Sequence, residues 1–233
     1  MSEMTQDHEE WLKARRELLV LEKAHSRAGD ELAALRRALP KVPVEDYVFQ
    51  SSTGPVRLSE LFAGRSQLIV QHMMFGPDWG AGCPICSFWA DGYDPMLVHM
   101  QQRDISFVAV SRAPVEKLMA YRKRMGWRFP WVSALENSFN FDFGVSVSAE
   151  DQARGTTEYN YAEVPARMDE MHGTSVFERT EAGQLLHTYS TYGRGLDAMN
   201  AAYGYIDLTP KGRNENNLPF SMAWVRRHDS YPD

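Results

Sequence analysis

Apolar runs and amphipathic stretches alternate along the chain and predict a β-α-β-α-β core. The nearly continuous apolar run over residues 66–75 is typical of a buried strand, and the run over 105–110 predicts a second one. A short strand is expected at 129–132. Two helical patterns lie between these strands, over 84–102 and over 114–125, and the first is expected to be kinked near its middle. This order favours helices packed on a partly parallel sheet.

A long amphipathic stretch precedes this core. From about residue 6 to residue 39, Trp11 and several leucines recur at three- and four-residue steps, which predicts a helix that Gly29 and Asp30 break into two. We expect this helix to dock onto the rest of the chain or to form a homo-oligomer with a second copy, because its apolar stripe would otherwise be exposed. A hairpin, 47–49 with 56–58, then leads into the first core strand.

The signals weaken after the core. Residues 136–172 are interpreted as a long insertion that either covers part of the molecule or holds short helices. Strands at 174–179 and 184–190 predict a late hairpin, followed by a short helix over 196–205. The predicted organisation is an N-terminal helical extension (1–40), a core domain (41–205) and a C-terminal tail that packs on this domain (206–233).

The candidate chemistry lies in the only two cysteines, Cys83 and Cys86, which stand in a C-x-x-C spacing between the first buried strand and its helix. This pattern is typical of a dithiol–disulfide site. We expect Cys83 at the helix N-cap, where free N–H groups favour a thiolate, and Cys86 one turn deeper as the shielded thiol. Pro84 suits the first helical position. Cys83 would then attack a disulfide, and Cys86 would resolve the mixed disulfide.

Two other interpretations of the cysteines stay open. They can be ordinary small buried residues, or they can form half of a zinc site that is completed by two of four histidines, His72, His99, His172 and His187. No second C-x-x-C and no H-x-x-x-H accompanies them, so redox chemistry is preferred, and neither a metal nor a cofactor is expected.

Composition and net charge limit the classes of molecule that we expect this protein to bind. Apolar residues make up 43% and charged residues 24% of the 233 residues, as in globular proteins. A net charge of −6 gives no broad basic field, so nucleic acid is not an expected partner. No apolar run is long enough to span a membrane, and no signal peptide is visible, so we expect a cytoplasmic protein. Its partners would be a protein or small-molecule disulfide or thiol, and a reductant that the sequence does not identify.

The order of elements resembles the thioredoxin-like α/β fold, in its peroxiredoxin-type branch, with a central mixed sheet flanked by helices, an added N-terminal helix and a long insertion. More specifically, five segments resemble the bacterial DUF899 family: 74–79, 82–91, 109–114, 125–131 and 207–214. The resemblance implies a dithiol–disulfide oxidoreductase. The resemblance is also compatible with a second function, that of a thioredoxin-like binding module without catalytic activity.

The resemblance also implies further site residues, together with some departures. Trp79, Pro84, Thr174 and Ser175 would contact the substrate. Thioredoxins place a buried carboxylate near position 71 or 72 and a cis-proline near 174–175, and this chain has neither. His72 is expected either as a hydrogen-bonded core residue or as a proton relay that replaces the carboxylate. Four late residues are further candidates for a substrate cleft: Tyr189, Tyr192, Arg194 and Arg213.

Overall fold

The computed structural model describes residues 2–232, and the chain divides into two compact units, Met1–Lys41 and Val42–Asp233. The first unit consists mainly of helix α1 (Ser2–Arg37). The expected break at Gly29 and Asp30 is wrong, because α1 runs through both residues without interruption. One glycine costs a helix interior about 1 kcal/mol, and the many good helix formers around it (Ala, Leu, Glu, Arg) offset that cost.

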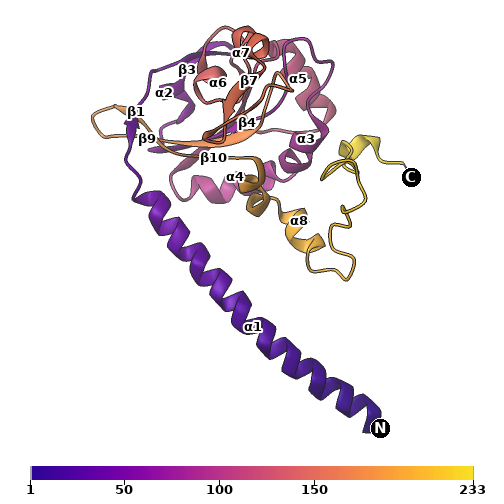
Figure 1. Ribbon diagram of the computed structural model, residues 1–233. Coiled ribbons are helices and arrows are strands. Elements are labelled where there is room, and N and C mark those ends of the chain that lie inside the picture. The colour runs from indigo at the N-terminus through magenta and orange to yellow at the C-terminus, as the bar shows by residue number, and fades with distance from the viewer. Residues whose placement is uncertain (1, 233) are drawn as a thin grey trace. The chain divides into compact units, whose positions relative to one another are not determined.

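The second unit is built on an eight-stranded mixed sheet in the order β1-β10-β9-β4-β5-β6-β2-β3 (Figure 1). The strands are β1 (Val42–Pro43), β2 (Val48–Ser51), β3 (Gly54–Arg57), β4 (Gln67–His72), β5 (Ile105–Ser111), β6 (Trp131–Ser133), β9 (Gly173–Arg179) and β10 (Leu185–Tyr192). The central strands β4, β5 and β6 are parallel, and the other pairings are antiparallel. The partly parallel sheet and both predicted hairpins are therefore confirmed.

The helices connect and cover these strands. They are α2 (Leu58–Leu61), α3 (Pro84–Ala90), α4 (Tyr93–Gln101), α5 (Val115–Arg124), α6 (Phe139–Asp142), α7 (Ala149–Arg154), α8 (Ala201–Ile206) and the 3-10 helices η1 (Gly193–Met199) and η2 (His228–Ser230). The kink expected within 84–102 is a complete break at Asp91 and Gly92, between α3 and α4. The 136–172 insertion holds α6, α7 and a small hairpin of β7 (Thr156–Tyr159) and β8 (Ala162–Pro165).

Alternation along the central strands divides the core between the two faces of the sheet. Ile69 packs in the cluster that includes Cys86 and Trp89, whereas Leu68 and Val70 pack in the cluster around Phe139. The first cluster is covered by α3, α4, α5 and α8, and the second by α2 and α6. Figure 1 shows α4 and α8 on one side of the strands and α2 and α6 on the other. We call these the cysteine face and the histidine face.

The topology is that of a thioredoxin-like fold. Strand β4 leads into the cysteine helix α3, the chain returns through β5 parallel to β4, and the antiparallel hairpin β9–β10 joins the sheet on the other side of β4. The hairpin β2–β3 extends the sheet beyond β6, as expected for the peroxiredoxin-type branch. The C-x-x-C motif thus follows the carboxyl end of a central strand, where ligands of open α/β sheets commonly bind.

Candidate functional site

The two cysteines lie at the first turn of α3. Cys83 is the N-cap residue and is partly buried, Pro84 follows at the first helical position, and Cys86 is buried with 6% of its surface exposed. The two cysteines lie 4.0 Å apart without a disulfide bond. The pair is therefore close enough to form a disulfide after a small side-chain rotation, and only one of its thiols is accessible.

The two thiols differ in acidity. A hydrogen bond from the Cys86 thiol lowers the pKa of Cys83 to about 7, although burial acts in the opposite direction. The backbone N–H groups of Cys86 and Ile85 and the positive charge of Arg227 lower it further. The pKa of Cys86 is raised well above its usual value by its hydrogen bond to Cys83, by burial and by the negative charge that Cys83 acquires. A thiolate therefore forms on Cys83 first.

The C-terminal tail contacts the motif directly. Arg227 donates from Nε and Nη2 to the carbonyl oxygen of Gly82, at 3.2 and 2.7 Å, and from Nε to the hydroxyl of Tyr121 at 2.8 Å. Its neighbour His228 is hydrogen-bonded to Asp91 at 2.7 Å, and Asp229 forms an ion pair with Arg124. Three consecutive tail residues thus hold this segment against the loop and helices that carry the cysteines.

A chain of hydroxyl groups continues from Arg227 to the backbone of the motif. Tyr121 lies 2.9 Å from the Ser87 hydroxyl, which donates to the carbonyl oxygen of Cys83 at 2.8 Å. The Tyr121 ring also fills the space beside Gly82, where an added Cβ would lie 2.9 Å from Cε1 of the ring. Gly82 is therefore required for this close approach.

The loop before Cys83 is held in place by several side chains. Lys117 donates to the carbonyl oxygens of Pro77 and Trp79, and the Trp79 indole donates to Asp169 at 3.3 Å. The next residue, Glu170, is buried, and burial raises its pKa to about 7 although it bonds Ser146 and Arg112. Trp79 itself is partly buried, and it packs against the hydrophobic cluster of the cysteine face.

The predicted contact residues Thr174 and Ser175 separate, because side chains alternate along β9. Thr174 pairs with Gln71 and donates its hydroxyl to the Gln71 side chain at 2.7 Å, on the cysteine face. Ser175 lies on the histidine face and bonds His72 at 2.9 Å and Ser190 at 2.8 Å. Ser175 therefore takes part in a buried hydrogen-bond network rather than in the surroundings of the cysteines.

His72 also belongs to the histidine face. It is fully buried, it stacks on Phe139 and Phe143, and its ring nitrogens face Asn140 and Ser175. Burial lowers its pKa to about 4, so it is neutral at pH 7. These contacts fit a hydrogen-bonded core residue better than a proton relay, because they lead away from the cysteines.

The zinc interpretation lacks its ligands in this arrangement. His72 and His187 both pack against Phe143 on the histidine face. Among residues 2–232, no three side chains of His, Cys, Asp or Glu are grouped in a way that would hold a metal ion. Within the same range, no helix has the length and apolar character that crossing a membrane requires.

Two functional candidates, Tyr121 and Arg227, were not found from the sequence. Both lie far from the motif in sequence, and local patterns do not report contacts over such separations. The group of charged residues at 226–229 is equally typical of a solvated tail, so it did not indicate the contact that Arg227 makes. Another tail residue, Trp224, packs against Phe88 of α3 in an edge-to-face contact.

Fold and site together define a thioredoxin-like protein with an asymmetric C-x-x-C dithiol. The chain matches the family described as bacterial protein of unknown function, DUF899, over residues 1–231, and it belongs to this family. The predicted resemblance is therefore confirmed. No curated protein matches the sequence.

Several solved structures are similar to the chain. Peroxidoxin BcpB from Mycobacterium tuberculosis has 17% identity and a TM-score of 0.46, over 71% of this chain and 96% of that one. Peroxiredoxin Q from Xanthomonas campestris has 17% identity and a TM-score of 0.45, over 67% of this chain and 89% of that one. A putative thiol:disulfide interchange protein DsbE from Chlorobium tepidum has 15% identity and a TM-score of 0.41, over 70% and 97%.

Proposed function

We propose that this protein is a thiol–disulfide oxidoreductase in which Cys83 is the nucleophile and Cys86 the resolving thiol. The observation that carries the proposal is the asymmetric pair itself. The cysteines lie 4.0 Å apart at the start of α3, with Cys83 partly exposed and Cys86 buried. A pKa of about 7 at Cys83 provides a thiolate near neutral pH without an adjacent base.

The reaction follows the chemistry of thiol–disulfide exchange. The Cys83 thiolate attacks one sulfur of a protein or small-molecule disulfide, and the other sulfur leaves as a thiolate. Cys86 then loses its proton and attacks the Cys83 sulfur, which releases the second substrate thiolate and leaves a Cys83–Cys86 disulfide. The substrate gains two electrons and the protein loses two. An external dithiol restores the reduced pair by the reverse exchange.

The surroundings of the pair support roles for other residues. Arg227 adds positive charge near Cys83 and fixes Gly82. Trp79, which packs on the same face of the sheet, and Pro84, the residue after Cys83, are our candidates for contacting the substrate. Thr174 lies on the same face of the sheet and is the remaining candidate for orienting a substrate backbone. A thioredoxin-like binding module without turnover is the alternative function.

Oxidation by glutathione disulfide tests the proposal. The reduced full-length protein is incubated with oxidised glutathione, quenched with acid, alkylated and weighed by intact-mass spectrometry. We expect both thiols to become protected together, as an intramolecular disulfide without a lasting glutathione adduct, and dithiothreitol to reverse the change. Incubation with reduced glutathione is the control. Two thiols that stay free would exclude the redox function and favour the binding module.

A turnover assay separates catalysis from simple oxidation. The protein should accelerate the reduction of insulin by dithiothreitol, and the Cys83→Ser variant should return the rate to that of dithiothreitol alone. A wild-type protein that forms the disulfide but gives no acceleration would contradict a general protein-disulfide substrate and restrict the reaction to small disulfides.

A further inference from the structure

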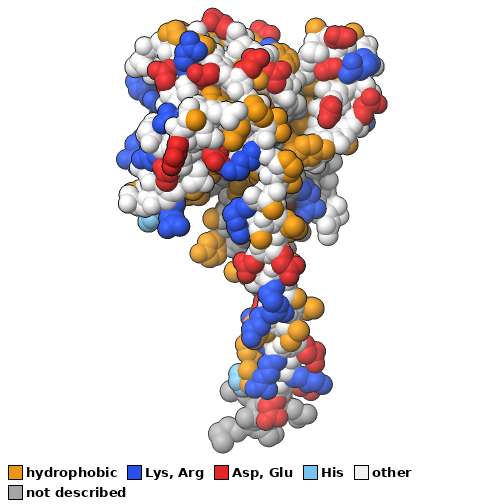
Figure 2. Space-filling model, turned by 90° about the vertical axis from the view of Figure 1, so that its left-hand side faces the viewer, with side chains coloured by type: hydrophobic (Ala, Val, Ile, Leu, Met, Phe, Trp, Pro, Cys, Tyr) orange, Lys and Arg blue, Asp and Glu red, His pale blue; other side chains and the backbone are white. Residues whose placement is uncertain are grey.

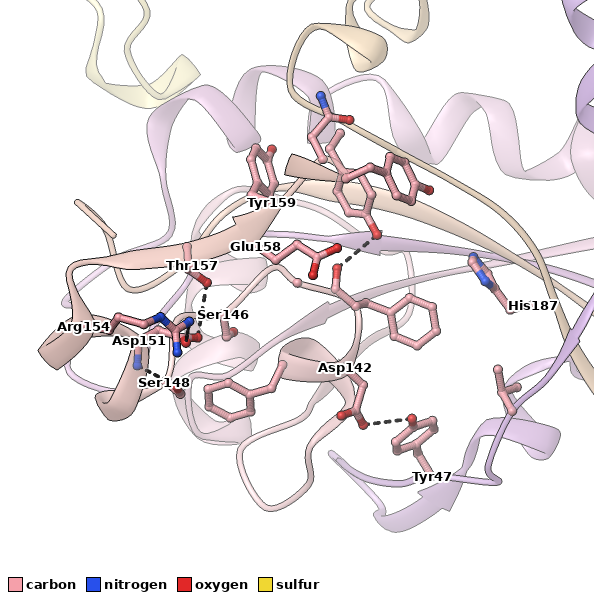
Figure 3. A pocket seen from close by; sticks show the side chains of 17 residues that line it. Tyr47, Asp142, Ser146, Ser148, Asp151, Arg154, Thr157, Glu158, Tyr159 and His187 are labelled. Atoms are coloured by element: carbon pink, nitrogen blue, oxygen red, sulfur yellow. Dashed lines mark hydrogen bonds and ion pairs between the residues drawn. The ribbon is translucent and has the colours of Figure 1, made fainter. Parts of the chain in front are cut away.

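The 136–172 insertion builds a pocket that the cysteine chemistry does not use. The pocket has a volume of about 670 Å³, and 13 of its 17 lining residues belong to the insertion (Figure 3). The other four, Val44, Tyr47, His187 and Tyr192, come from the main sheet and the segments beside it. The pocket borders the histidine-face cluster, since Phe143 both lines it and packs against that cluster. Its volume lies within the range of about 300–1,000 Å³ that small-molecule sites have.

Three tyrosines form an aromatic corner of this pocket. The buried Tyr192 ring makes edge contacts with Tyr159 at 5.4 Å and with Tyr161 at 5.8 Å, at interplanar angles of 62° and 71°. Ring faces at steep angles to one another are the geometry with which aromatic cages surround an organic cation.

The β7–β8 turn presents Tyr161 at a conformational cost. Asn160 and Tyr161 both have positive φ angles, 52° and 62°, which a bulky residue such as tyrosine rarely adopts. The Tyr161 hydroxyl donates to the carbonyl oxygen of Ser190, which ties the turn to β10. Tyr161 is nevertheless 71% exposed, so core packing does not explain why a tyrosine occupies this strained position.

The uncompensated charge in the pocket is negative. Arg154 is paired with Asp151 at the edge of the pocket, and burial lowers the pKa of His187, which keeps it neutral. The side chain of Glu158 makes no hydrogen bond or ion pair with any residue in the described part of the chain, and Figure 3 shows it in the middle of the lining residues. Asp142 adds a second carboxylate, which accepts a hydrogen bond from Tyr47 at 2.9 Å.

We propose that this pocket binds a small organic cation with a quaternary or methylated ammonium group. The tyrosine rings offer their faces to the methyl groups, and Glu158 supplies the counter-charge. An anion would be repelled by Glu158 and Asp142, and a neutral apolar ligand would remove water from Glu158 without replacing its interactions. This binding does not depend on the cysteine chemistry.

A pair of matched probes tests the charge requirement. Choline and 3,3-dimethyl-1-butanol have the same shape, and only choline is charged. In calorimetric titrations of the full-length protein, we expect saturable choline binding at least about tenfold tighter than that of the neutral alcohol. Equal binding of the two compounds, or no saturable binding of choline, would overturn the proposal.

Substitutions then locate the site. Glu158→Gln should weaken choline binding about fivefold or more, whereas Glu150→Gln, which removes an exposed carboxylate outside the pocket, should change it less than about twofold. Tyr161→Leu should weaken binding about threefold, and Tyr161→Phe should retain it because the ring remains. Circular dichroism checks that each variant is folded. Unchanged binding in Glu158→Gln or in Tyr161→Leu would show that choline binds elsewhere.

A separate observation concerns α1, in which apolar residues occupy seven of eight consecutive a and d positions of a heptad repeat. Numbering Trp11 as position a places Trp11, Leu18, His25 and Leu32 at a positions and Ala14, Leu21, Ala28 and Leu35 at d positions. A spacing of 3.5 residues sustained over this length is the pattern of a coiled coil rather than of a helix that packs on a globular core. Figure 2 shows hydrophobic, acidic and basic side chains interspersed along the visible surface of α1.

The flanking charges favour a second copy of this chain in parallel orientation. In a parallel pair, each g residue faces the e residue five positions later in the partner helix. Glu10 would then face Arg15 and Glu31 would face Arg36, while Glu17 and Glu22 form one pair of like charges. We infer that α1 forms a parallel two-stranded coiled coil with the α1 of a second chain.

The oligomeric state of matched variants tests this inference. Wild-type protein should be a dimer by light scattering, and Leu21→Glu, at a d position, should convert it to monomer. Val20→Glu adds the same charge one residue away, at a c position outside the seam, and should leave the dimer intact. A monomeric wild type, or equal effects of the two substitutions, would overturn the inference. A disulfide between two copies of the Leu18→Cys variant would separate parallel from antiparallel pairing, because only parallel helices bring two copies of this position together.

Discussion

Gln71 and His72 are neighbours on β4, yet they belong to two different environments. Gln71 bonds Thr174 on the cysteine face, and His72 bonds Ser175 and Asn140 on the histidine face. On the cysteine face, Arg227 of the C-terminal tail and Ser87 hydrogen-bond the backbone beside the two thiols. On the histidine face, burial keeps the histidine neutral beside a pocket built by the insertion.

The comparison teaches that one sheet separates two kinds of polar site. On the cysteine face, positive charge from Arg227 and donated hydrogen bonds favour an anion, the Cys83 thiolate. In the pocket beyond the histidine face, the unpaired carboxylate of Glu158 favours a cation. The following predictions test whether the two faces are as independent as this contrast implies.

The largest expected effect concerns His72, whose burial should make the stability of the folded protein depend on pH. Its pKa is about 4 in the folded protein, below the usual 6.5, so folding favours the neutral ring. The resulting stability is fully present above pH 6.5 and is lost as the pH falls to 4, by up to about 3 kcal/mol. Relative to His72→Gln, the wild type should lose this amount in urea unfolding between pH 7 and 4. Parallel curves for the two proteins would contradict the buried, neutral histidine.

The next effect concerns the Cys83 thiol, on the other face. Cys86→Ala removes the hydrogen bond that contributes most to lowering the Cys83 pKa, so this pKa should rise from about 7 toward that of a free cysteine. Alkylation by iodoacetamide measured across pH reports the change. Cys86→Ser keeps a hydrogen-bond donor and should show a smaller rise. His72→Gln should leave the profile unchanged, and a shift there would show that the faces are coupled.

Tyr121→Phe should give a smaller effect. The phenol links Arg227 to Ser87, and its loss leaves the buried Ser87 and the half-buried Arg227 each without one hydrogen bond. We expect destabilisation of about 1–3 kcal/mol in urea unfolding. Tyr47→Phe, which breaks one hydrogen bond to the exposed Asp142, is the control and should cost less than about 1 kcal/mol. An equal cost for both would mean that the Tyr121 hydroxyl stabilises the fold no more than an exposed hydrogen bond does.

The smallest effect is expected for Arg227→Met. Positive charge at Arg227 lowers the Cys83 pKa, but it contributes less than the hydrogen bonds do. The variant should raise this pKa slightly and slow alkylation at pH 7 about twofold, and Arg227→Lys should restore part of the rate because it keeps the charge. A rate that falls equally in both variants would indicate that Arg227 acts only by fixing Gly82.

The sequence predicted the parts of this molecule that depend on local pattern. The apolar run before Cys83, the C-x-x-C spacing and Pro84 were enough to place the cysteines at the start of a helix, and the structure has them there. The faces of the sheet were harder. Side chains alternate along a strand, so Thr174 and Ser175 point to opposite faces of the sheet. The family resemblance suggested both residues together and did not say which face each one occupies.

The features that the sequence did not predict depend on contacts between segments that are distant in the chain. The tail contact of Arg227 spans 145 residues, and no local periodicity reports it. The insertion was recognised by its length and weak patterning, but its pocket forms only when its turns meet Tyr47, His187 and Tyr192 from the main sheet and its surroundings. In α1, the single Gly29 was given too much weight as a helix breaker against the many helix formers around it.

The most direct test of the central claim, the asymmetry of the two thiols, is trapping of mixed disulfides. Cys86→Ser and Cys83→Ser variants are incubated with oxidised glutathione and weighed by intact-mass spectrometry. Cys86→Ser retains the accessible nucleophile without its resolving thiol, so it should accumulate one bound glutathione. Cys83→Ser retains only the buried thiol and should stay largely unmodified. Equal trapping by both variants, or preferential trapping by Cys83→Ser, would contradict the assignment of Cys83 as the nucleophile and Cys86 as the resolving thiol.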